Sequence, residues 1–348
     1  MGVRVGWEYV EYTEGSGDLP QPRIVVVGCG GGGCNSVHRL NEIGISCAET
    51  VAINTDRPHL SRIKAHKRLL IGQGVTNGLG AGSDPNVGRT CAENSVPEIS
   101  KLLYQADLTF ITVGLGGGTG TGLAPVVADV ARRQGSVVVV IATTPFEVEG
   151  SRNRVALRGI RELRGLCDTL LLLDNNRLLE MVANLPVHQA FAVMDQLISE
   201  IIKGMVEAIT EPSLINLDFA DLRTIMRKGG ISTVLYGENS DPESVVKDAL
   251  SNPLLDIDIS GAKAAMVHIT GGAGLTLKKV NKLMMTLHQY LDRDANIIFG
   301  AKVEENEGPI KLLAVVTGIA ELDDAQSDDH DEVDVIDDLE LTAERYST

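Results

Sequence analysis

Short apolar runs alternate with helical patterns along the first half of the chain. The apolar runs of strand length cover residues 23–27, 50–53, 108–113, 137–143 and 170–173. Runs that are apolar throughout are typical of strands buried on both faces of a parallel sheet. Helical spacing follows in residues 35–43, which Gly44 closes, and in residues 123–134. The alternation predicts an α/β fold with a parallel sheet.

The second half of the chain follows a different pattern. Residues 187–209 are apolar around most of a helical girth, so we expect a buried helix of about 35 Å that connects two domains. After Gly229, strand patterns cover residues 231–235, 264–269, 296–301 and 312–317, with helical patterns in residues 242–250 and 277–292. This part therefore predicts strands with helices interspersed among them.

Composition limits the class of protein. The chain has 348 residues and 43% hydrophobic content, which fits a globular protein of two domains. Aromatic residues make up 3%, which argues against stacking on nucleic acid. The sequence shows no apolar run of 18 residues and no export signal, so no membrane insertion is expected. Five cysteines without a C-x-x-C pair indicate free thiols in a reducing cytoplasm.

The net charge of -16 is concentrated at the C-terminal end. From Glu321 onward, twelve acidic residues face one arginine, so this segment carries -11 and residues 1–320 carry -5. Such a segment cannot bury enough apolar surface to fold alone, and we expect a disordered acidic tail. Its small apolar cluster around residues 333–341 either docks on a partner or has no binding role.

A glycine-rich stretch carries the first candidate chemistry. Residues 114–122 read Gly-Leu-Gly-Gly-Gly-Thr-Gly-Thr-Gly, between an apolar run and a helical pattern. Each glycine would cost about 0.5–1 kcal/mol inside regular structure, so the run indicates a tight turn that something approaches closely. Backbone N–H groups, the helix dipole and the hydroxyls of Thr119 and Thr121 would bind an anion there. A packing turn of small residues is the alternative.

Two further glycine segments separate the possible ligands. Residues 28–33 match G-x-G-x-x-G, which alone would suggest a dinucleotide and an NAD-dependent oxidoreductase. Residues 78–82 supply a third segment, and a pyrophosphate bridge needs only one. Three segments at one sheet edge fit a nucleoside triphosphate better. No Walker-type G-x-x-x-x-G-K-[ST] occurs, so backbone donors, a divalent cation and an arginine would have to meet the phosphate charge.

These residues resemble the FtsZ family of the tubulin superfamily. The loop at residues 116–122 resembles the tubulin signature loop, and residues 216–221, Asn-Leu-Asp-Phe-Ala-Asp, resemble the synergy loop of FtsZ. The resemblance covers roughly residues 23–320. It implies a parallel-sheet GTP-binding domain of tubulin type, a long central helix, a smaller α+β C-terminal domain and head-to-tail polymerisation. GTP or GDP would bind with Mg²⁺ held mainly through the phosphates, without a dedicated protein metal site.

The resemblance assigns nucleotide contacts to positions along the whole first domain. They are Gly30, Gly31, Gly32, Asn35, Asn54, Asp56, Ala81, Gly82, Gly116, Gly117, Gly118, Thr119, Gly120, Thr121, Gly122, Pro145, Glu149, Arg152, Asn153, Asn175, Phe191 and Asp195. Glu149 would contact the ribose, Asn175 and Asp195 the guanine, and Phe191 would stack on the base. Because guanine offers two donors on one edge, Asp195 would select GTP over ATP. The family's arginine four positions after this glutamate is Asn153 here, and the choice between Arg152 and Arg154 stays open.

The loop after the long helix carries a second hypothesis. Asn216, Asp218 and Asp221 gather polar groups within six residues. Without the resemblance, Asp218 reads as the cap of a helix over residues 220–226. With it, the three residues complete the active site of the neighbouring subunit. An aspartate of ordinary pKa is a weak general base at neutral pH, so orienting water or a cation is the expected role.

The predicted organisation is therefore a flexible arm (residues 1–22), a GTP-binding domain (23–186), the central helix and synergy loop (187–223), the C-terminal domain (224–320) and the acidic tail (321–348). The predicted function is that of an assembly-stimulated GTPase that forms cytoplasmic filaments at the mid-cell division site. A membrane-tethering partner would bind the tail, and nucleic acid would not be a partner. The alternative is a nucleotide-binding scaffold in cell shape or regulation without efficient hydrolysis.

Overall fold

The computed structural model describes residues 21–177, 185–211, 215, 218–227, 231–251, 259–304 and 308–319. The predicted acidic tail, Asn216 and all but the last two residues of the predicted arm lie outside these ranges. Among the described residues, no helix is both long and apolar enough to cross a membrane.

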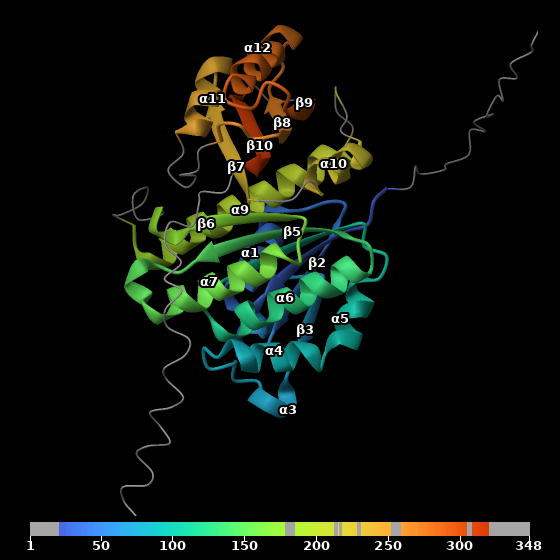
Figure 1. The fold of residues 1–348 in the computed structure, drawn as a ribbon, viewed down its shortest axis with the longest axis vertical. Helices are drawn as coiled ribbons and strands as arrows, with labels where there is room; N and C mark the ends of the chain where they lie inside the picture. Colours follow the sequence, from blue (N-terminus) through green and yellow to red (C-terminus); the bar gives the residue numbers. More distant parts are fainter. Residues whose placement is uncertain are drawn as a thin grey trace, which may run out of the picture.

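One ten-stranded sheet runs through the molecule in the order β3-β2-β1-β4-β5-β6-β7-β10-β8-β9 (Figure 1). The strands are β1 Ile24–Cys29, β2 Ala48–Asn54, β3 Lys67–Leu70, β4 Leu108–Gly114, β5 Val137–Thr144, β6 Thr169–Asp174, β7 Ile231–Asn239, β8 Ala264–Gly271, β9 Asn296–Val303 and β10 Ile310–Ile319. The first six strands are parallel to one another. Strand β10 runs antiparallel to β7 and β8, which makes the C-terminal part mixed.

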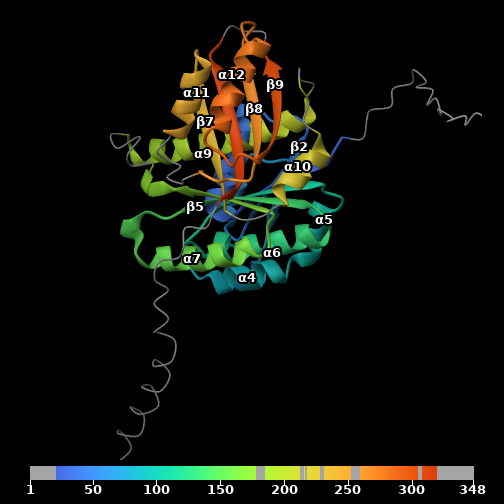
Figure 2. The ribbon, with the colours of Figure 1, turned by 45° about the horizontal axis from the view of Figure 1, so that its top comes forward.

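Helices cover both faces of this sheet. They are α1 Gly30–Ile43, α2 Arg57–Arg62, α3 Gln73–Thr76, α4 Pro85–Glu93, α5 Val96–Leu103, α6 Gly118–Arg133, the 3-10 helix η1 Glu147–Glu149, α7 Ser151–Arg164, α9 Val187–Thr210, α10 Phe219–Met226, α11 Pro242–Leu250 and α12 Leu277–His288. Helices α4, α6 and α7 form an outer layer on one side (Figure 2). Helices α1 and α9 pack on the other side of the sheet.

Three hydrophobic cores follow from this layering. One lies between the sheet and α1 with α9, and a second lies between the opposite sheet face and the helices from α4 to α7. The third lies between the C-terminal strands and α11 with α12. Strand β5 is buried from Val137 to Ala142, as a continuous apolar run predicts for a strand covered on both faces.

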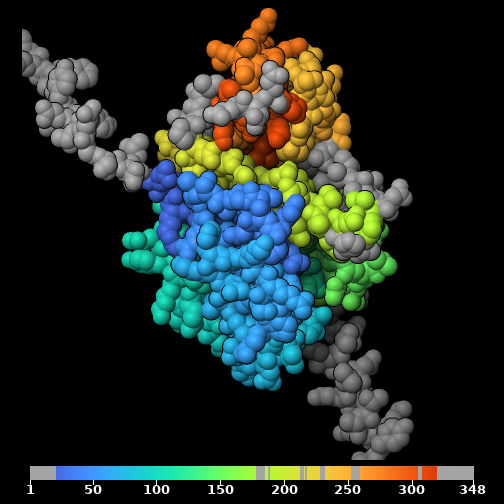
Figure 3. Space-filling view, turned by 180° about the vertical axis from the view of Figure 1, so that it is seen from behind, coloured from blue at the N-terminus to red at the C-terminus, as the bar shows by residue number. Residues whose placement is uncertain are grey.

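Helix α9 joins the two parts of the molecule. Its 24 residues span about 36 Å, and its buried residues include Met194, Ile198, Ile201 and Met205 at helical spacing. In the same core, these side chains meet residues of β1 and β4 as well as Val234 and Leu313 of the C-terminal strands. Figure 3 shows α9 as a yellow band between the blue N-terminal part and the orange and red C-terminal strands.

Two helices begin earlier than the sequence predicts. Helix α1 begins at Gly30 instead of residue 35, and α6 begins at Gly118 instead of residue 123. The glycines expected in loops therefore form the first helical turns. Close packing explains their presence, because a Cβ at Gly33 would lie 2.0 Å from the carbonyl oxygen of Thr112. The cost of helical glycine is offset by the contact of two backbones.

Candidate functional site

A cavity of about 480 Å³ lies at the carboxyl edge of β4 and β5, beside the first turns of α1 and α6. Its walls are Gly31, Gly32, Asn35, Ser36, Thr112, Val113, Gly114, Leu115, Gly117, Gly118, Thr119, Gly120, Thr143, Pro145, Glu149, Arg152, Asn175, Phe191, Met194, Asp195 and Ile198. Ligands of open parallel sheets bind in this place, at the edge where strands deliver the chain to helices.

The glycines of this cavity fall into two groups. Some allow backbones to touch: a Cβ at Gly118 would lie 2.6 Å from the amide nitrogen of Asp84, and one at Gly30 would lie 2.6 Å from that of Gly120. Gly31 and Gly117 are different, because a Cβ there would meet no atom within 4 Å. Both line the cavity, so their missing side chains leave room for a ligand at the backbone.

Two helix N-termini at the cavity have no side-chain cap. Cys29 precedes α1, and its side chain accepts no hydrogen bond from the first turn; Gly117 precedes α6 and has no side chain to accept one. The first N–H groups of a helix need partners from outside the helix, and the helix dipole favours a negative one. Two such ends beside one cavity form a site for an anion with several oxygens.

Thr119 ties the first turn of α6 to the residue that follows β2. Its Oγ1 lies 2.6 Å from Oγ1 of Thr55, which follows β2. The side chain of Thr121 has a different role, because its hydroxyl accepts a hydrogen bond at 3.0 Å from the N–H of Gly116. Thr121 is buried outside the cavity lining, where this contact closes the loop, and its hydrogen bond to a phosphate stays a prediction.

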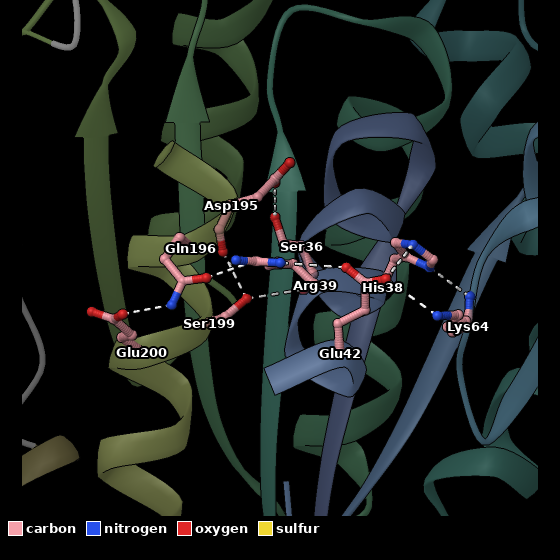
Figure 4. Close-up of polar contacts among 9 residues, drawn as sticks. All are labelled: Ser36, His38, Arg39, Glu42, Lys64, Asp195, Gln196, Ser199 and Glu200. Atoms are coloured by element: carbon pink, nitrogen blue, oxygen red, sulfur yellow. Dashed lines mark hydrogen bonds and ion pairs between the residues drawn. The ribbon is translucent and has the colours of Figure 1, made fainter. Parts of the chain in front are cut away.

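The opposite end of the cavity holds an acidic side chain from α9. The hydroxyl of Ser36 donates to Oδ1 of Asp195 at 2.7 Å (Figure 4). Burial raises the pKa of Asp195 to about 6, although the Ser36 hydrogen bond and the charge of Arg39 act in the opposite direction. Arg39 itself donates to Oε1 of Gln196 at 2.6 Å. The carboxylate thus lies in a site where a further donor would stabilise its charged form.

Asn175 and Phe191 complete this end. Asn175 is 8% exposed, and its Oδ1 has no hydrogen-bond partner among the described residues. A buried acceptor without a partner is costly, and a donor from a ligand would satisfy it. Phe191 is 42% exposed and meets the ring of Phe146 edge-on, with 5.6 Å between centroids. Its free face borders the cavity, where a planar ligand would stack.

The cavity rim between β5 and α7 is tied together by polar contacts. Glu149 accepts from the N–H of Phe146 at 3.0 Å and pairs with Arg152 at 2.7 Å. Asn153 donates to the carbonyl oxygens of Phe146 and Glu147 and does not line the cavity. Arg152 lines the cavity and Arg154 does not, so the structure favours Arg152 for contact with an anion.

The predicted synergy residues lie at the other edge of the sheet. Asp218 caps α10 by accepting from the N–H of Ala220 at 3.0 Å, and Asp221 is exposed in the first turn. Arg223 of α10 donates to the carbonyl of Gly135, which precedes β5. The β5 arrow in Figure 1 accordingly points away from α10. Because the eight residues of β5 span about 23 Å, these aspartates cannot reach the cavity of their own subunit.

Comparison with known proteins identifies the family. Residues 23–183 match the Tubulin/FtsZ family, GTPase domain, and residues 230–320 match the FtsZ family, C-terminal domain. Cell division protein FtsZ 2 from Halobacterium salinarum is 50% identical over 306 residues, which cover 87% of this chain and 78% of that protein. The chain belongs to the FtsZ family.

Further relatives of the FtsZ family agree. Cell division protein FtsZ 2 from Methanocaldococcus jannaschii is 49% identical over 309 residues, 87% of this chain and 81% of that protein. The solved structure of an FtsZ dimer from M. jannaschii superposes with a TM-score of 0.82 at 44% identity, covering 86% of this chain and 88% of that one. The tubulin-type GTPase domain, the central helix and the α+β C-terminal part are therefore confirmed, while the predicted domain boundaries stay predictions.

Within this FtsZ-family fold, the cavity collects part of the predicted nucleotide contacts. Predicted residues that line it are Gly31, Gly32, Asn35, Gly117, Gly118, Thr119, Gly120, Pro145, Glu149, Arg152, Asn175, Phe191 and Asp195. Predicted residues outside its lining are Gly30, Asn54, Asp56, Ala81, Gly82, Gly116, Thr121, Gly122 and Asn153. Several of the second group have structural partners instead: Oδ1 of Asn54 accepts from the N–H of Thr55, and Asp56 caps α2.

The sequence interpretation missed several FtsZ-fold residues that line the cavity. They include Ser36, Thr112, Thr143, Met194 and Ile198. Ser36 follows Asn35 on α1, and a polar residue on the face turned toward the cavity was a usable signal. The apolar Met194 and Ile198 carried no such signal, because they share the stripe that packs α9 into the core. Among the described residues, no group of three metal-binding side chains occurs.

Proposed function

We propose that the cavity binds GTP and that hydrolysis is completed by the next subunit of a head-to-tail filament. The observation that carries the proposal is the separation of two half-sites on one rigid sheet: anion-binding helix ends at the carboxyl edge, and Asp218 with Asp221 at the amino edge. A contact that joins unlike faces repeats without closing when the rotation between copies is small. The dimer of the M. jannaschii FtsZ structure supports self-association of this fold.

The guanine would lie at the α9 end of the cavity. The carboxylate of Asp195 would accept from two guanine donors, Oδ1 of Asn175 would accept a third contact, and Phe191 would stack on the ring. Adenine has neither the N1–H nor the C2 amino group of guanine, so the same carboxylate would face the acceptor N1. Selection of GTP over ATP follows from this difference, because a buried carboxylate without a donor is costly.

The phosphates would lie against the first turns of α1 and α6. Backbone N–H groups of residues 117–120 and 31–32 would donate to phosphate oxygens, and Arg152 would supply a positive charge at the rim. The described residues that line the cavity fit a phosphate-bound Mg²⁺ held mainly by phosphate oxygens, since they offer no carboxylate cluster. Such an ion would neutralise charge on the transferred phosphoryl group.

Asp218 and Asp221 would act on the nucleotide of the neighbouring copy. Both are exposed, and with Asn216, which lies outside the described residues, they would orient the attacking water. A nucleotide-binding scaffold that does not hydrolyse would use the same cavity without these residues. Under the proposal, the hydrolysis rate per subunit rises with protein concentration, because the site forms only on assembly.

Complementation between two inactive variants tests this inter-subunit site. Asp221→Ala keeps the nucleotide cavity but loses a side chain that would act on the neighbouring subunit. Asp195→Asn weakens nucleotide binding in the cavity but keeps Asp218 and Asp221. Each alone should hydrolyse GTP slowly, and a mixture should recover activity at interfaces that combine the two intact halves. Phosphate release from the mixture measures this. If the mixture is no faster than its components, or if the wild-type rate per subunit is independent of concentration, the proposed mechanism is wrong.

The division role of the FtsZ family suggests where the filaments act. We place them in the cytoplasm at the mid-cell division site, with a membrane-tethering protein bound to the acidic tail, whose twelve acidic residues would face a basic partner surface. Deletion of residues 321–348 should leave GTP-dependent sedimentation intact and abolish recruitment to the membrane. Loss of sedimentation by the shortened chain would contradict this assignment.

A further inference from the structure

Helix α7 carries a row of arginines on its outer face. Arg154, Arg158 and Arg161 recur at helical spacing and are exposed, and we call them the arginine stripe. The buried residues of the helix are Ala156, Gly159, Ile160 and Leu163. At 100° per residue these two sets lie on opposite sides of the helix, so packing of α7 against the sheet turns the stripe to the outside. Figure 2 shows α7 in the outer helical layer.

The stripe has no partner within the described residues. None of its three guanidinium groups forms an ion pair or hydrogen bond there, and the single carboxylate of α7, Glu162, pairs with Arg89. Like charges three and four residues apart disfavour a helix, and a cation in the first turn opposes the helix dipole. Stability of α7 therefore does not explain the pattern. A positive surface in a chain of net charge -16 points to an acidic ligand.

An apolar side chain lies within the same surface. Leu157 is 53% exposed, and it is one helical turn from both Arg154 and Arg161. The acidic tail has the complementary composition in residues 331–341, which contain six acidic residues, five apolar residues and no lysine or arginine. The carboxylates of this segment would pair with the guanidinium groups, and its apolar side chains would cover Leu157. A phosphate surface, such as that of nucleic acid, would leave Leu157 uncovered.

The tail also begins close to α7. Ile319, the last residue of β10, pairs with Ile231, and Leu170 of β6 pairs with the same residue. Two strand spacings, about 10 Å, therefore separate Ile319 from Leu170, which lies six residues after the end of α7. Residues 320–330 can extend over about 36 Å. This reach is sufficient for residues 331–341 to lie along the stripe of the same chain.

We propose that residues 331–341 dock on the arginine stripe of their own chain. Carboxylates of the segment pair with Arg154, Arg158 and Arg161, and an apolar side chain covers Leu157. A partner that binds the tail must then compete with the arginine stripe, so docking lowers the apparent affinity of the tail for that partner. The proposal is independent of GTP binding and hydrolysis, and its test uses no nucleotide.

Carbodiimide cross-linking of the full chain tests the docking. Arg154→Lys, Arg158→Lys and Arg161→Lys are combined, which keeps the charge and adds amines that link to carboxylates. The matched control combines Arg57→Lys, Arg62→Lys and Arg68→Lys, which are also exposed arginines without a carboxylate partner in the described ranges. Mass spectrometry should find tail cross-links at the stripe in roughly tenfold excess over the control surface, decreasing at high salt.

An equal mixture of ¹⁵N-labelled and unlabelled chains separates docking within a chain from docking between chains. Cross-linked pairs of the same isotope are expected, and a statistical share of mixed pairs would overturn docking within the chain. Equal cross-linking at the stripe and the control surface would reduce the contact to unspecific attraction and overturn the proposal. Binding of the full chain to phosphatidylglycerol vesicles that is lost in the Arg154→Glu, Arg158→Glu, Arg161→Glu variant, without tail cross-links, would assign the stripe to lipid instead.

Discussion

Affinity for guanine nucleotide should depend on pH through Asp195. Burial raises the pKa of this carboxyl to about 6 in the protein without nucleotide. Guanine would donate to the carboxylate, so binding favours the charged form and lowers the pKa. Below pH 6 the free protein holds the proton, and binding must release it. The affinity for GDP should therefore rise with pH up to about 6 and level off above it.

The size of the effect follows from the fraction of ionised carboxyl. With a pKa of about 6, the Asp195 carboxyl is ionised in roughly one-tenth of the free protein at pH 5 and in nine-tenths at pH 7. The affinity for GDP should therefore be about tenfold lower at pH 5 than at pH 7. Isothermal titration calorimetry with GDP measures this without hydrolysis. Because the terminal phosphate of the nucleotide also titrates near pH 6, the Asp195→Asn variant is the reference that isolates the protein group.

Two variants test different parts of this assignment. Asp195→Asn should lose GDP affinity at pH 7, by roughly 10-fold or more for each lost hydrogen bond to the charged group, and should show only the phosphate's pH dependence. Ser36→Ala removes a hydrogen bond that lowers the pKa of Asp195, so the midpoint of the pH dependence should move upward. The assignment of the carboxylate to guanine would be refuted by two results together. These are an unchanged pH midpoint of GDP affinity in Ser36→Ala and a wild-type pH dependence of that affinity in Asp195→Asn.

Glycine and histidine variants provide further tests. Gly118→Ala should lower the melting temperature, because its Cβ would lie 2.6 Å from the amide nitrogen of Asp84, whereas Gly31→Ala should fold normally and weaken GDP binding, because its Cβ would enter the cavity; thermal melts and calorimetry separate the two. His268 is 4% exposed, both ring nitrogens lack a partner among the described residues, and burial lowers its pKa to about 4. Since the unfolded chain takes up the proton more readily, this residue should reduce stability by about 2 kcal/mol at pH 5 relative to pH 7 and above, and His268→Leu should remove that loss in urea unfolding.

The strands buried on both faces were predictable because their pattern depends on burial alone, whereas β3, Lys67–Leu70, was missed because its first two residues are exposed and break the apolar run. The predicted run over residues 137–143 and the observed β5, Val137–Thr144, differ by one residue, since a strand covered on both faces needs an apolar residue at every position. The predicted starts of α1 and α6 were wrong by five residues, because they depend on a contact between distant parts of the chain and not on the local pattern. Local propensity places glycine outside helices, but the close approach of Gly33 to the Thr112 carbonyl requires it inside one.

Individual roles within the site were harder to predict than its location. Asn54 and Asp56 follow a strand at the edge where ligands bind, yet hydrogen bonds to nearby backbone N–H groups occupy both side chains. Amide and carboxylate groups satisfy a turn and a ligand equally well, so sequence cannot separate the two uses. The choice between Arg152 and Arg154 depended on which of the two positions, 200° apart on α7, turns toward the cavity, and the sequence analysis predicted no helix over these residues.

The aspartates of α10 show why a divided site is difficult to recognise in one chain. Asp218 has a complete structural role as a helix cap, and a subunit viewed alone gives Asp221 no ligand to contact. The parallel strands nevertheless impose a direction: every crossover helix returns the chain to the amino edge, so groups after a helix and groups after a strand are held about 23 Å apart along β5. A rigid sheet cannot bring them together within one subunit. If both edges take part in one reaction, the second copy is required by the geometry of the strands themselves.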